Sequence, residues 1–132
     1  PDQAGVRQMY SEWFTPVAQR HLQVHTNLVS PSTVPVRVDR VERHPHAAQA
    51  FVPLDTGRYL VVVMPSTRSG EPDPSGARAF VMPPTLGVLY RPHTWHAGIT
   101  ALDRPASFTV LMWRGAADDD VFAAITPLVV HA

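Results

Sequence analysis

The most constraining feature of this sequence is its proline content. Fourteen prolines are spread over 132 residues, and each fixes its own backbone torsion and removes a hydrogen-bond donor, which interrupts helices and central strands. The segments between them are short, rich in Val, Phe and Tyr, and recur roughly every ten residues, as in a β-sandwich or β-barrel. The expected strands are Leu22–Ser30, Val34–Glu42, Ala48–Pro53, Tyr59–Pro65, Ala77–Met82, Gly87–Arg91, His96–Thr100, Ser107–Arg114 and Leu128–His131.

Four segments carry further local predictions. The run YLVVVM, Tyr59–Met64, has no polar alternate positions, so we expect a strand covered on both faces. Pro35–Glu42 alternates apolar and polar residues until the pattern slips near Arg40, where we expect a β-bulge. Residues 117–125, ADDDVFAAI, place acids where a helix N-terminus favours them and are predicted to begin a helix. Residues 1–14 are expected to form a helical turn or two.

The composition excludes several classes of chemistry. All eleven cationic residues are arginines scattered singly along the chain, without the basic cluster that follows a phosphate backbone, so we do not expect nucleic-acid binding. The sequence contains neither lysine nor cysteine, which excludes Schiff bases, thiolate nucleophiles and disulfides. No apolar run reaches the roughly 18 residues of a membrane span.

These limits favour one cytoplasmic domain. A chain of 132 residues can bury its own core, and no charged-then-apolar leader is visible. We therefore expect a single domain over residues 1–132, without membrane contact, in which residues 1–21 form an irregular or truncated N-terminal segment.

Two polar clusters lie far apart in the sequence, on or beside expected strands. The first, VERHPHAAQAF (Val41–Phe51), contains His44 and His46, and the second, Gly87–Ile99, contains His96. Alternate residues of an extended strand share a face, so His44 and His46 are expected to point the same way. In a small barrel, side chains from non-adjacent strands share one interior, whose mouth is a common ligand site. We therefore expect His96 to face His44 and His46.

The two clusters also carry a family resemblance. Their histidine, amide, glycine and proline residues follow an order that resembles the paired motifs of cupins: His44, His46, Gln49 and Gly57, then Gly87, Pro92 and His96. Within that superfamily, the blocks VERHPHAAQAFVPLDTGRYLVVV, RAFVMPPTLGVLYRPHTWHAGITAL and ASFTVLMWRG are similar to ureidoglycolate lyase. The similarity runs from about Leu22 to Arg114, with departures at His93, Ala97 and Trp113.

The resemblance implies an all-β fold, the cupin-type double-stranded β-helix or jelly-roll barrel, and a lyase activity. Ureidoglycolate lyases cleave ureidoglycolate to urea and glyoxylate, a late step in the breakdown of allantoin and hence of purines. The substrate carries a hydroxyl and a ureido group on one carbon, next to a carboxylate. Its cleavage needs a base, an acid and a cation for the carboxylate, but no covalent intermediate.

The matching blocks supply candidates for each role. His44 and His96 are the acid–base candidates, because imidazole titrates near neutral pH, and which is the acid and which the base stays open. Glu42 is expected to orient a histidine. The predicted substrate-binding residues are Gln49 for the urea amide, Arg91 or Arg43 for the carboxylate, and Tyr90 and Trp95 as pocket lining.

One divalent metal ion is the alternative to acid–base groups alone. Its predicted ligands are His44, His46, Gln49 and His96, whose imidazole and amide groups suit nickel, zinc, manganese or iron. The resemblance implies nickel. It also implies a homodimer, for which the valine-rich strands leave enough apolar surface.

Simpler interpretations of the same residues stay open. His44 and His46 flank a proline and could be solvated turn residues. Glu42 and Arg43 could form an exposed ion pair, and His93 is expected to be an exposed loop side chain. Two other functions also stay open: a cupin that binds a small carboxylate without turnover, and another metal-dependent cupin enzyme.

Overall fold

The computed structural model describes residues 11–132 and contains ten β-strands, a short 3₁₀-helix η1 (Pro74–Gly76) and, within those residues, no α-helix. The strands are β1 (His21–Val29), β2 (Val36–Arg43), β3 (Gln49–Asp55), β4 (Tyr59–Met64), β5 (Arg78–Met82), β6 (Val88–Tyr90), β7 (Trp95–His96), β8 (Thr100–Ala101), β9 (Ala106–Arg114) and β10 (Val121–Val130). No helix in this part of the chain has the length and apolar character needed to cross a membrane.

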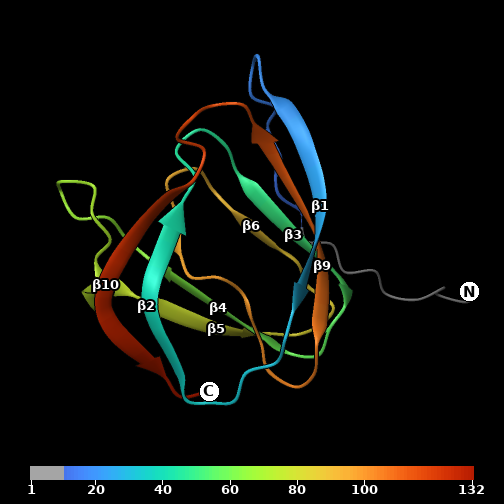
Figure 1. Ribbon diagram of the computed structural model, residues 1–132, viewed down its shortest axis with the longest axis vertical. Helices are drawn as coiled ribbons and strands as arrows, with labels where there is room; N and C mark the ends of the chain where they lie inside the picture. The colour runs from blue at the N-terminus through green and yellow to red at the C-terminus, as the bar shows by residue number, and fades with distance from the viewer. Residues whose placement is uncertain (1–10) are drawn as a thin grey trace, which may run out of the picture.

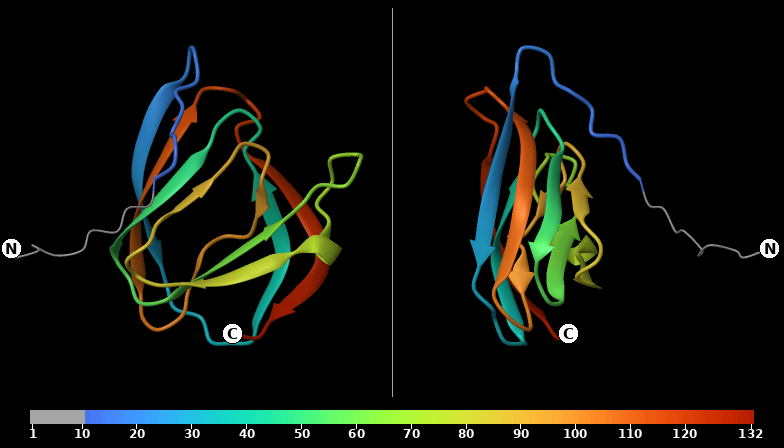
Figure 2. Two further views of the ribbon diagram at one scale, coloured as in Figure 1. Left: turned by 180° about the vertical axis from the view of Figure 1, so that it is seen from behind. Right: turned by 90° about the vertical axis from the view of Figure 1, so that its right-hand side faces the viewer.

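The strands form two antiparallel sheets. One has the order β1-β9-β3-β6, and the other has the order β10-β2-β7-β4-β5, with β8 also paired to β4. Figure 1 shows β10 and β2 on one side, β4 and β5 across the lower part, and β1, β9, β3 and β6 on the remaining side, so that the sheets surround a common core. The view from behind in Figure 2 shows the same enclosure. This is the cupin-type jelly roll that the resemblance implies.

Strand β4 is buried on both faces, as its sequence predicts. Tyr59 and Val61 belong to an apolar cluster that includes Phe108, whereas Leu60 and Val62 belong to a second cluster. The second cluster lies against β2 and also contains Trp95. Because successive side chains of a strand point to opposite faces, β4 divides the core and contributes to both halves.

All nine expected strands overlap observed ones, with one split. The expected strand His96–Thr100 is two short strands, β7 and β8, separated by Ala97–Ile99. The helix predicted over residues 117–125 is wrong, because Val121–Val130 form strand β10. Half-buried Val121 and Ala123 alternate with exposed Phe122, a period of two that suits a strand with one covered face. The acids before it form a turn.

The irregularity expected near Arg40 of β2 lies in the neighbouring strand, β10. Asp39 and Arg40 are both exposed, so the alternation does slip. The register shift falls between Ala124 and Leu128 of β10, which face Arg40 and Val38. The additional residues therefore belong to β10 and not to β2, where the sequence pattern had suggested a bulge.

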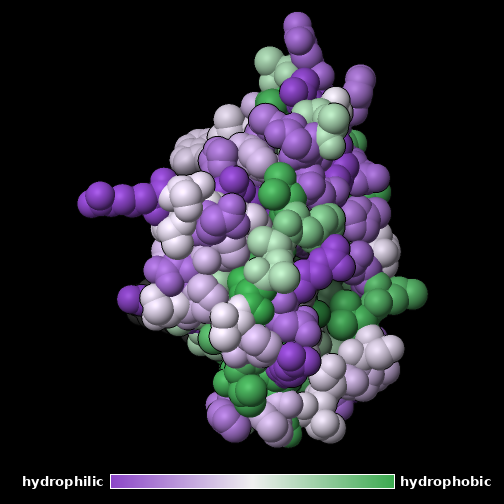
Figure 3. Space-filling view, turned by 60° about the vertical axis from the view of Figure 1, so that its left-hand side comes forward, coloured by the Kyte–Doolittle hydropathy of each residue, from purple (hydrophilic) through white to green (hydrophobic). Residues whose placement is uncertain are grey.

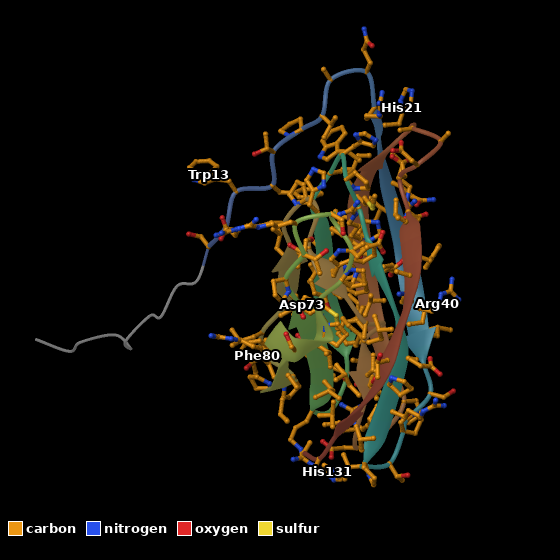
Figure 4. All side chains as sticks on the ribbon, turned by 90° about the vertical axis from the view of Figure 1, so that its left-hand side faces the viewer. Trp13, His21, Arg40, Asp73, Phe80 and His131 are labelled. Carbon is orange, nitrogen blue, oxygen red and sulfur yellow. The ribbon has the colours of Figure 1, made fainter. Side chains whose placement is uncertain are left out.

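The surface and the N-terminal segment complete the description. Figure 3 shows one face of the molecule, on which hydrophobic residues lie in small groups among hydrophilic ones. Ser11–Phe14 have no regular structure, and residues 1–10, which share the helical-turn prediction, lie outside the described residues. Figure 4 shows Trp13 on a segment that stands away from the sheets, and its side chain is 88% exposed.

Candidate functional site

The site is built on two cross-strand pairs, one in each sheet. Glu42 on β2 lies directly opposite His96 on β7, and Gln49 on β3 lies directly opposite Tyr90 on β6. Residues that face each other in an antiparallel ladder have Cβ atoms roughly 4.5–5.5 Å apart. Strand register therefore brings together side chains that are far apart in sequence.

His44 connects the two pairs from the segment between β2 and β3. Its ring centroid lies 5.2 Å from that of His96, and its Nε2 lies 2.9 Å from Oε1 of Gln49. The backbone N–H of His93 donates to the carbonyl of His44 at 2.9 Å, which holds this segment against the turn before β7. The two sequence clusters thus meet in one place, as predicted, and His44 is buried, which excludes the solvated-turn interpretation for it.

His96 presents one ring nitrogen to the site. Its Nδ1 lies 2.9 Å from the carbonyl oxygen of Thr94, and because a carbonyl only accepts, Nδ1 carries the proton. Its ring stacks on Tyr90, with centroids 3.8 Å apart and planes 10° from parallel. The other nitrogen, Nε2, is buried and has no hydrogen-bond partner among the described residues.

Glu42 faces that free nitrogen. Its Oε1 lies 3.5 Å from Nε2 of His96, too far for a strong hydrogen bond. The neighbouring His96 lowers the pKa of Glu42, although partial burial acts in the opposite direction. A proton or cation between these two acceptors would satisfy both. Glu42 therefore does not form the exposed pair with Arg43 that was one interpretation of the sequence.

The opposite side of the His44 ring is held by the connection between β9 and β10. Nδ1 of His44 lies 3.0 Å from the carbonyl oxygen of Asp119 and 3.0 Å from Oδ1 of Asp120. Nη1 of Arg114 lies 2.8 Å from the other carboxylate oxygen of Asp120. Burial raises the pKa of Asp120, but its contacts with Arg114 and His44 outweigh burial and the pKa is lowered.

Tyr90 adds a second buried polar atom without a partner. Its side chain is 3% exposed, and its hydroxyl has no hydrogen-bond partner among the described residues. Burial raises the pKa of Tyr90 far above its ordinary value, with further contributions from Tyr59 and Glu42. The hydroxyl therefore stays neutral and is available as a donor.

Glu42, His44 and His96 form a group that could hold a metal ion, because one ligand atom from each lies within 4.8 Å of the others. The two histidines are 2% and 1% exposed, and the Glu42 side chain is 24% exposed, so Glu42 forms the accessible edge. Two imidazoles and a carboxylate suit divalent first-row ions. Both histidines also direct Nδ1 to protein oxygens, as metal-bound histidines commonly do. The donor set therefore fits a metal ion.

The predicted metal ligands need one correction. His46 is exposed, and its Nε2 contacts Oδ1 of Asp118 at 2.7 Å, so it is not in the group. The chain bends at Pro45 and His46, which ends the strand alternation that should have aligned His46 with His44. Glu42, predicted as an orienting residue, is in the group instead. The amide oxygen of Gln49, another predicted ligand, lies 2.9 Å from Nε2 of His44.

Three predicted substrate-binding residues contact other parts of the chain. Nη1 of Arg43 donates to the carbonyl of Gly70 at 2.9 Å, and its guanidinium lies 4.6 Å from the ring centroid of Trp95. Trp95 donates to the same carbonyl at 3.2 Å. Arg91 is exposed and lies 3.3 Å from Glu12. His93 is exposed, as predicted.

Arg91 also lines a cavity of about 350 Å³ outside the histidine group. His46 and the N-terminal residues Glu12 and Trp13 contribute to its wall. His46 and Arg91 therefore line this cavity, whose wall, among the described residues, does not include Glu42, His44 or His96.

Sequence reasoning missed Thr94, Asp119 and Asp120. Thr94 and Asp119 contribute backbone carbonyls, which leave no residue-type signal. Asp120 could have been found, because an acid directly before an alternating apolar strand is placed at a sheet end, beside neighbouring strand ends.

Comparisons with known proteins agree with the family resemblance of the sequence. The model of the family described as "Ureidoglycolate lyase" matches residues 4–130. A ureidoglycolate lyase of Burkholderia cepacia is 42% identical over 82 residues, covering 61% of this chain and 45% of the relative. One from Mesorhizobium japonicum is 35% identical over 82 residues, covering 62% and 48%. One from Escherichia coli O1:K1 / APEC is 32% identical over 98 residues, covering 74% and 60%.

The chain spans about half the length of the first two of these relatives, with 45% and 48% of them covered. The family match nevertheless extends over nearly the whole chain and includes both halves of the histidine group. The chain therefore belongs to the ureidoglycolate lyase family.

Proposed function

We propose that this chain is a ureidoglycolate lyase that acts on its small-molecule substrate to release urea and glyoxylate. The observation that carries the proposal is the group of Glu42 and the buried His44 and His96, with Gln49 and Tyr90 beside it, in a chain of this family. The group combines imidazoles, a carboxylate and unpartnered polar atoms. These are the groups that an elimination at a hydroxylated carbon requires.

His96 is the proposed base. In the reaction the substrate hydroxyl loses its proton, its oxygen becomes the aldehyde carbonyl of glyoxylate, and the carbon–nitrogen bond breaks. Nε2 of His96 has a free lone pair because the Thr94 carbonyl holds the ring proton on Nδ1. Glu42, 3.5 Å away, would stabilise the imidazolium that forms.

His44 is the proposed acid. Its Nδ1 faces the oxygens of Asp119 and Asp120, and its Nε2 faces Oε1 of Gln49. Because each ring nitrogen faces an oxygen that can accept, each is placed to donate a proton that it carries. The proton on Nε2 can pass to the departing urea nitrogen, while the proton on Nδ1 stays in place.

Gln49 and Tyr90 are the proposed binding groups closest to the histidines. Gln49 offers its amide to the ureido group, and the neutral Tyr90 hydroxyl offers a donor to a substrate oxygen. The predicted partners of the substrate carboxylate, Arg43 or Arg91, would each have to leave a present contact, with Gly70 or Glu12. Trp95 is proposed as lining beside Arg43.

As the alternative to this acid–base scheme, we propose that Glu42, His44 and His96 hold one divalent metal ion, which family resemblance suggests is nickel. The two histidines would then be ligands and not the acid and the base. When bound, such an ion would polarise a substrate oxygen as a Lewis acid. Metal analysis of the purified protein tests this, and removal of the metal by a chelator should lower both thermal stability and turnover. Equal stability and turnover before and after complete chelation would contradict it.

The assembly and compartment follow as further proposals. We propose a homodimer, supported by Leu22, Val24 and Leu28 on β1, whose side chains are 42%, 59% and 82% exposed. Analytical ultracentrifugation should give twice the monomer mass. We propose a cytoplasmic location, because a chain without cysteine makes no use of an oxidising compartment; fractionation of cells expressing the protein tests this.

The activity is tested by incubating the purified protein with ureidoglycolate and measuring urea and glyoxylate in equal amounts. His96→Ala should lower turnover by roughly 10²- to 10⁴-fold, the usual contribution of an acid–base group. Near-ultraviolet circular dichroism and the thermal midpoint establish that the variant is folded. Binding of ureidoglycolate without urea release would indicate a binding module instead. Normal turnover by His96→Ala would refute the assignment of the base.

A further inference from the structure

The three consecutive acids Asp118, Asp119 and Asp120 each contact a different partner. Asp118 contacts His46 at the surface, at 2.7 Å. Asp119 turns its carboxylate back into its own loop, and only its backbone carbonyl contacts His44. Asp120 is the one member whose carboxylate contacts the buried His44. Of these three carboxylates, only that of Asp120 contacts the site, so a neighbouring acid of the same loop can serve as a control.

Asp119 closes the turn. Its Oδ2 accepts hydrogen bonds from the backbone N–H groups of Gly115, at 2.8 Å, and Ala116, at 3.2 Å. Gly115 has φ of +151°, a conformation that favours glycine. The closed turn fixes the Asp119 carbonyl, which lies 3.0 Å from Nδ1 of His44.

Asp120 is held at both oxygens. Oδ2 contacts Nη1 of Arg114 at 2.8 Å, and Oδ1 lies 3.0 Å from Nδ1 of His44. Arg114 ends β9 and Asp120 directly precedes β10, so the ion pair ties the two ends of the connection together. Its geometry leaves the second oxygen of Asp120 facing the imidazole.

We infer that Asp120 is a positioning residue for His44. Together with the Asp119 carbonyl, its carboxylate keeps a proton on Nδ1, so that Nε2 is the ring atom presented to Gln49 and to the substrate. The carbonyl of Thr94 does the same for His96. A histidine's function depends on which nitrogen faces the ligand, and the partner of the other nitrogen decides this. The inference concerns the proposed lyase site, but which ring nitrogen carries the proton can be measured without turnover.

Asp120→Asn separates positioning from loop anchoring. Arg114 is a donor, so it would take the amide oxygen and leave the amide NH₂ facing Nδ1 of His44. This NH₂ group would compete with the Asp119 carbonyl at Nδ1 and shift the ring towards the form with its proton on Nε2 alone. The variant thus keeps the size of Asp120 and its contact with Arg114, and reverses the polarity of its contact with His44.

The test uses metal-free protein of this sequence labelled with ¹⁵N at histidine, in which ring nitrogen shifts show which nitrogen is protonated. Nδ1 of His44 should carry a proton in the wild-type protein, and the fraction of rings protonated at Nδ1 should fall in Asp120→Asn, where only the Asp119 carbonyl still accepts that proton. Asp118→Asn, the matched control on the same loop, should leave the His44 signals unchanged. A wild-type spectrum without a proton on Nδ1 would overturn the inference, even if Asp120→Asn failed to fold.

Kinetics provide the second readout. Asp120→Asn should lower kcat for urea release roughly 10- to 100-fold, the range seen for such supporting contacts, with little change in KM. A reduced kcat without any change in the protonation of the His44 ring nitrogens would contradict the positioning role. If the wild-type protein released no urea, the proposed function would fail, but the ring spectra would still decide the role of Asp120.

Discussion

The two ends of the sandwich differ in their ionisable side-chain pairs: those at one end are short and exposed, whereas the Glu42–His96 pair at the other end is longer and partly buried. At the end where β3 finishes, Arg58 contacts Asp103 at 2.8 Å and Arg104 contacts Asp55 at 2.6 Å. These four side chains are between 39% and 73% exposed. At the end where β3 begins, the Glu42–His96 pair is longer, 3.5 Å, although His96 is almost fully buried.

The difference supports a structural role for the exposed pairs and the proposed functional role for the Glu42–His96 pair. The exposed pairs are complete: Asp103 also accepts from the backbone N–H of Arg58, so these contacts close the loops and leave little capacity for a ligand. The buried end is incomplete, with unpartnered atoms on His96 and Tyr90. Buried polar atoms without partners are costly, and a bound substrate or ion would remove that cost.

The largest expected effect compares the two acids. Glu42→Gln should lower the rate of urea release by roughly 10²- to 10⁴-fold, because the amide cannot stabilise a charged His96. Asp103→Asn should leave that rate unchanged, because it lies in the loop-closing pair at the other end. Steady-state kinetics on both variants check this. An equal loss of rate in Glu42→Gln and Asp103→Asn would contradict the assignment of function to the Glu42–His96 end alone.

The next effect compares two buried tyrosines. Tyr90→Phe should lower kcat/KM by about tenfold, the value of one hydrogen bond to the substrate, while stabilising the free protein by about 1 kcal/mol because an unpartnered hydroxyl is removed. Tyr59, whose hydroxyl donates to the Leu86 carbonyl, is the control. Tyr59→Phe should lose about 1 kcal/mol of stability and keep its activity. Denaturant unfolding should show a gain in stability for Tyr90→Phe and a loss for Tyr59→Phe. Steady-state kinetics should show a reduced kcat/KM for Tyr90→Phe alone.

The smallest effect concerns acid stability at the exposed end. Hydrogen bonds from the Arg58 side chain and backbone lower the pKa of Asp103 from 3.8 to about 2. Because the folded state holds the charged form more tightly, this contribution is present above pH 3.8 and is lost as the pH falls towards 2. Asp103→Asn should therefore flatten the fall in thermal midpoint over that interval. An unchanged acid profile would mean that the pair contributes nothing measurable.

Much of the fold was predictable because its signals are local. Proline spacing and period-two patterns located all nine expected strands, and YLVVVM correctly indicated a strand buried on both faces. The helix predicted over residues 117–125 was wrong because acids favour both helix starts and turns. The alternation of Val121, Phe122 and Ala123 was the better guide.

The site was predictable where strands determined it and not where turns did. Glu42 and His96 lie on paired strands, so their blocks sufficed to bring them together. His46 was misplaced because the bend at Pro45 ends the strand. The supporting contacts of Asp119 and Thr94 come from backbone carbonyls. Every residue has such a carbonyl, so the residue type at these positions could not predict the contacts.

The brevity of β7 has a consequence for engineering. This strand is only Trp95–His96, and it pairs with β2 on one side and β4 on the other. Inserting one residue between Thr94 and Trp95 would exchange the faces of Trp95 and His96, placing an indole where the imidazole belongs. Libraries that vary loop length in this protein should therefore leave the turn before β7 unchanged.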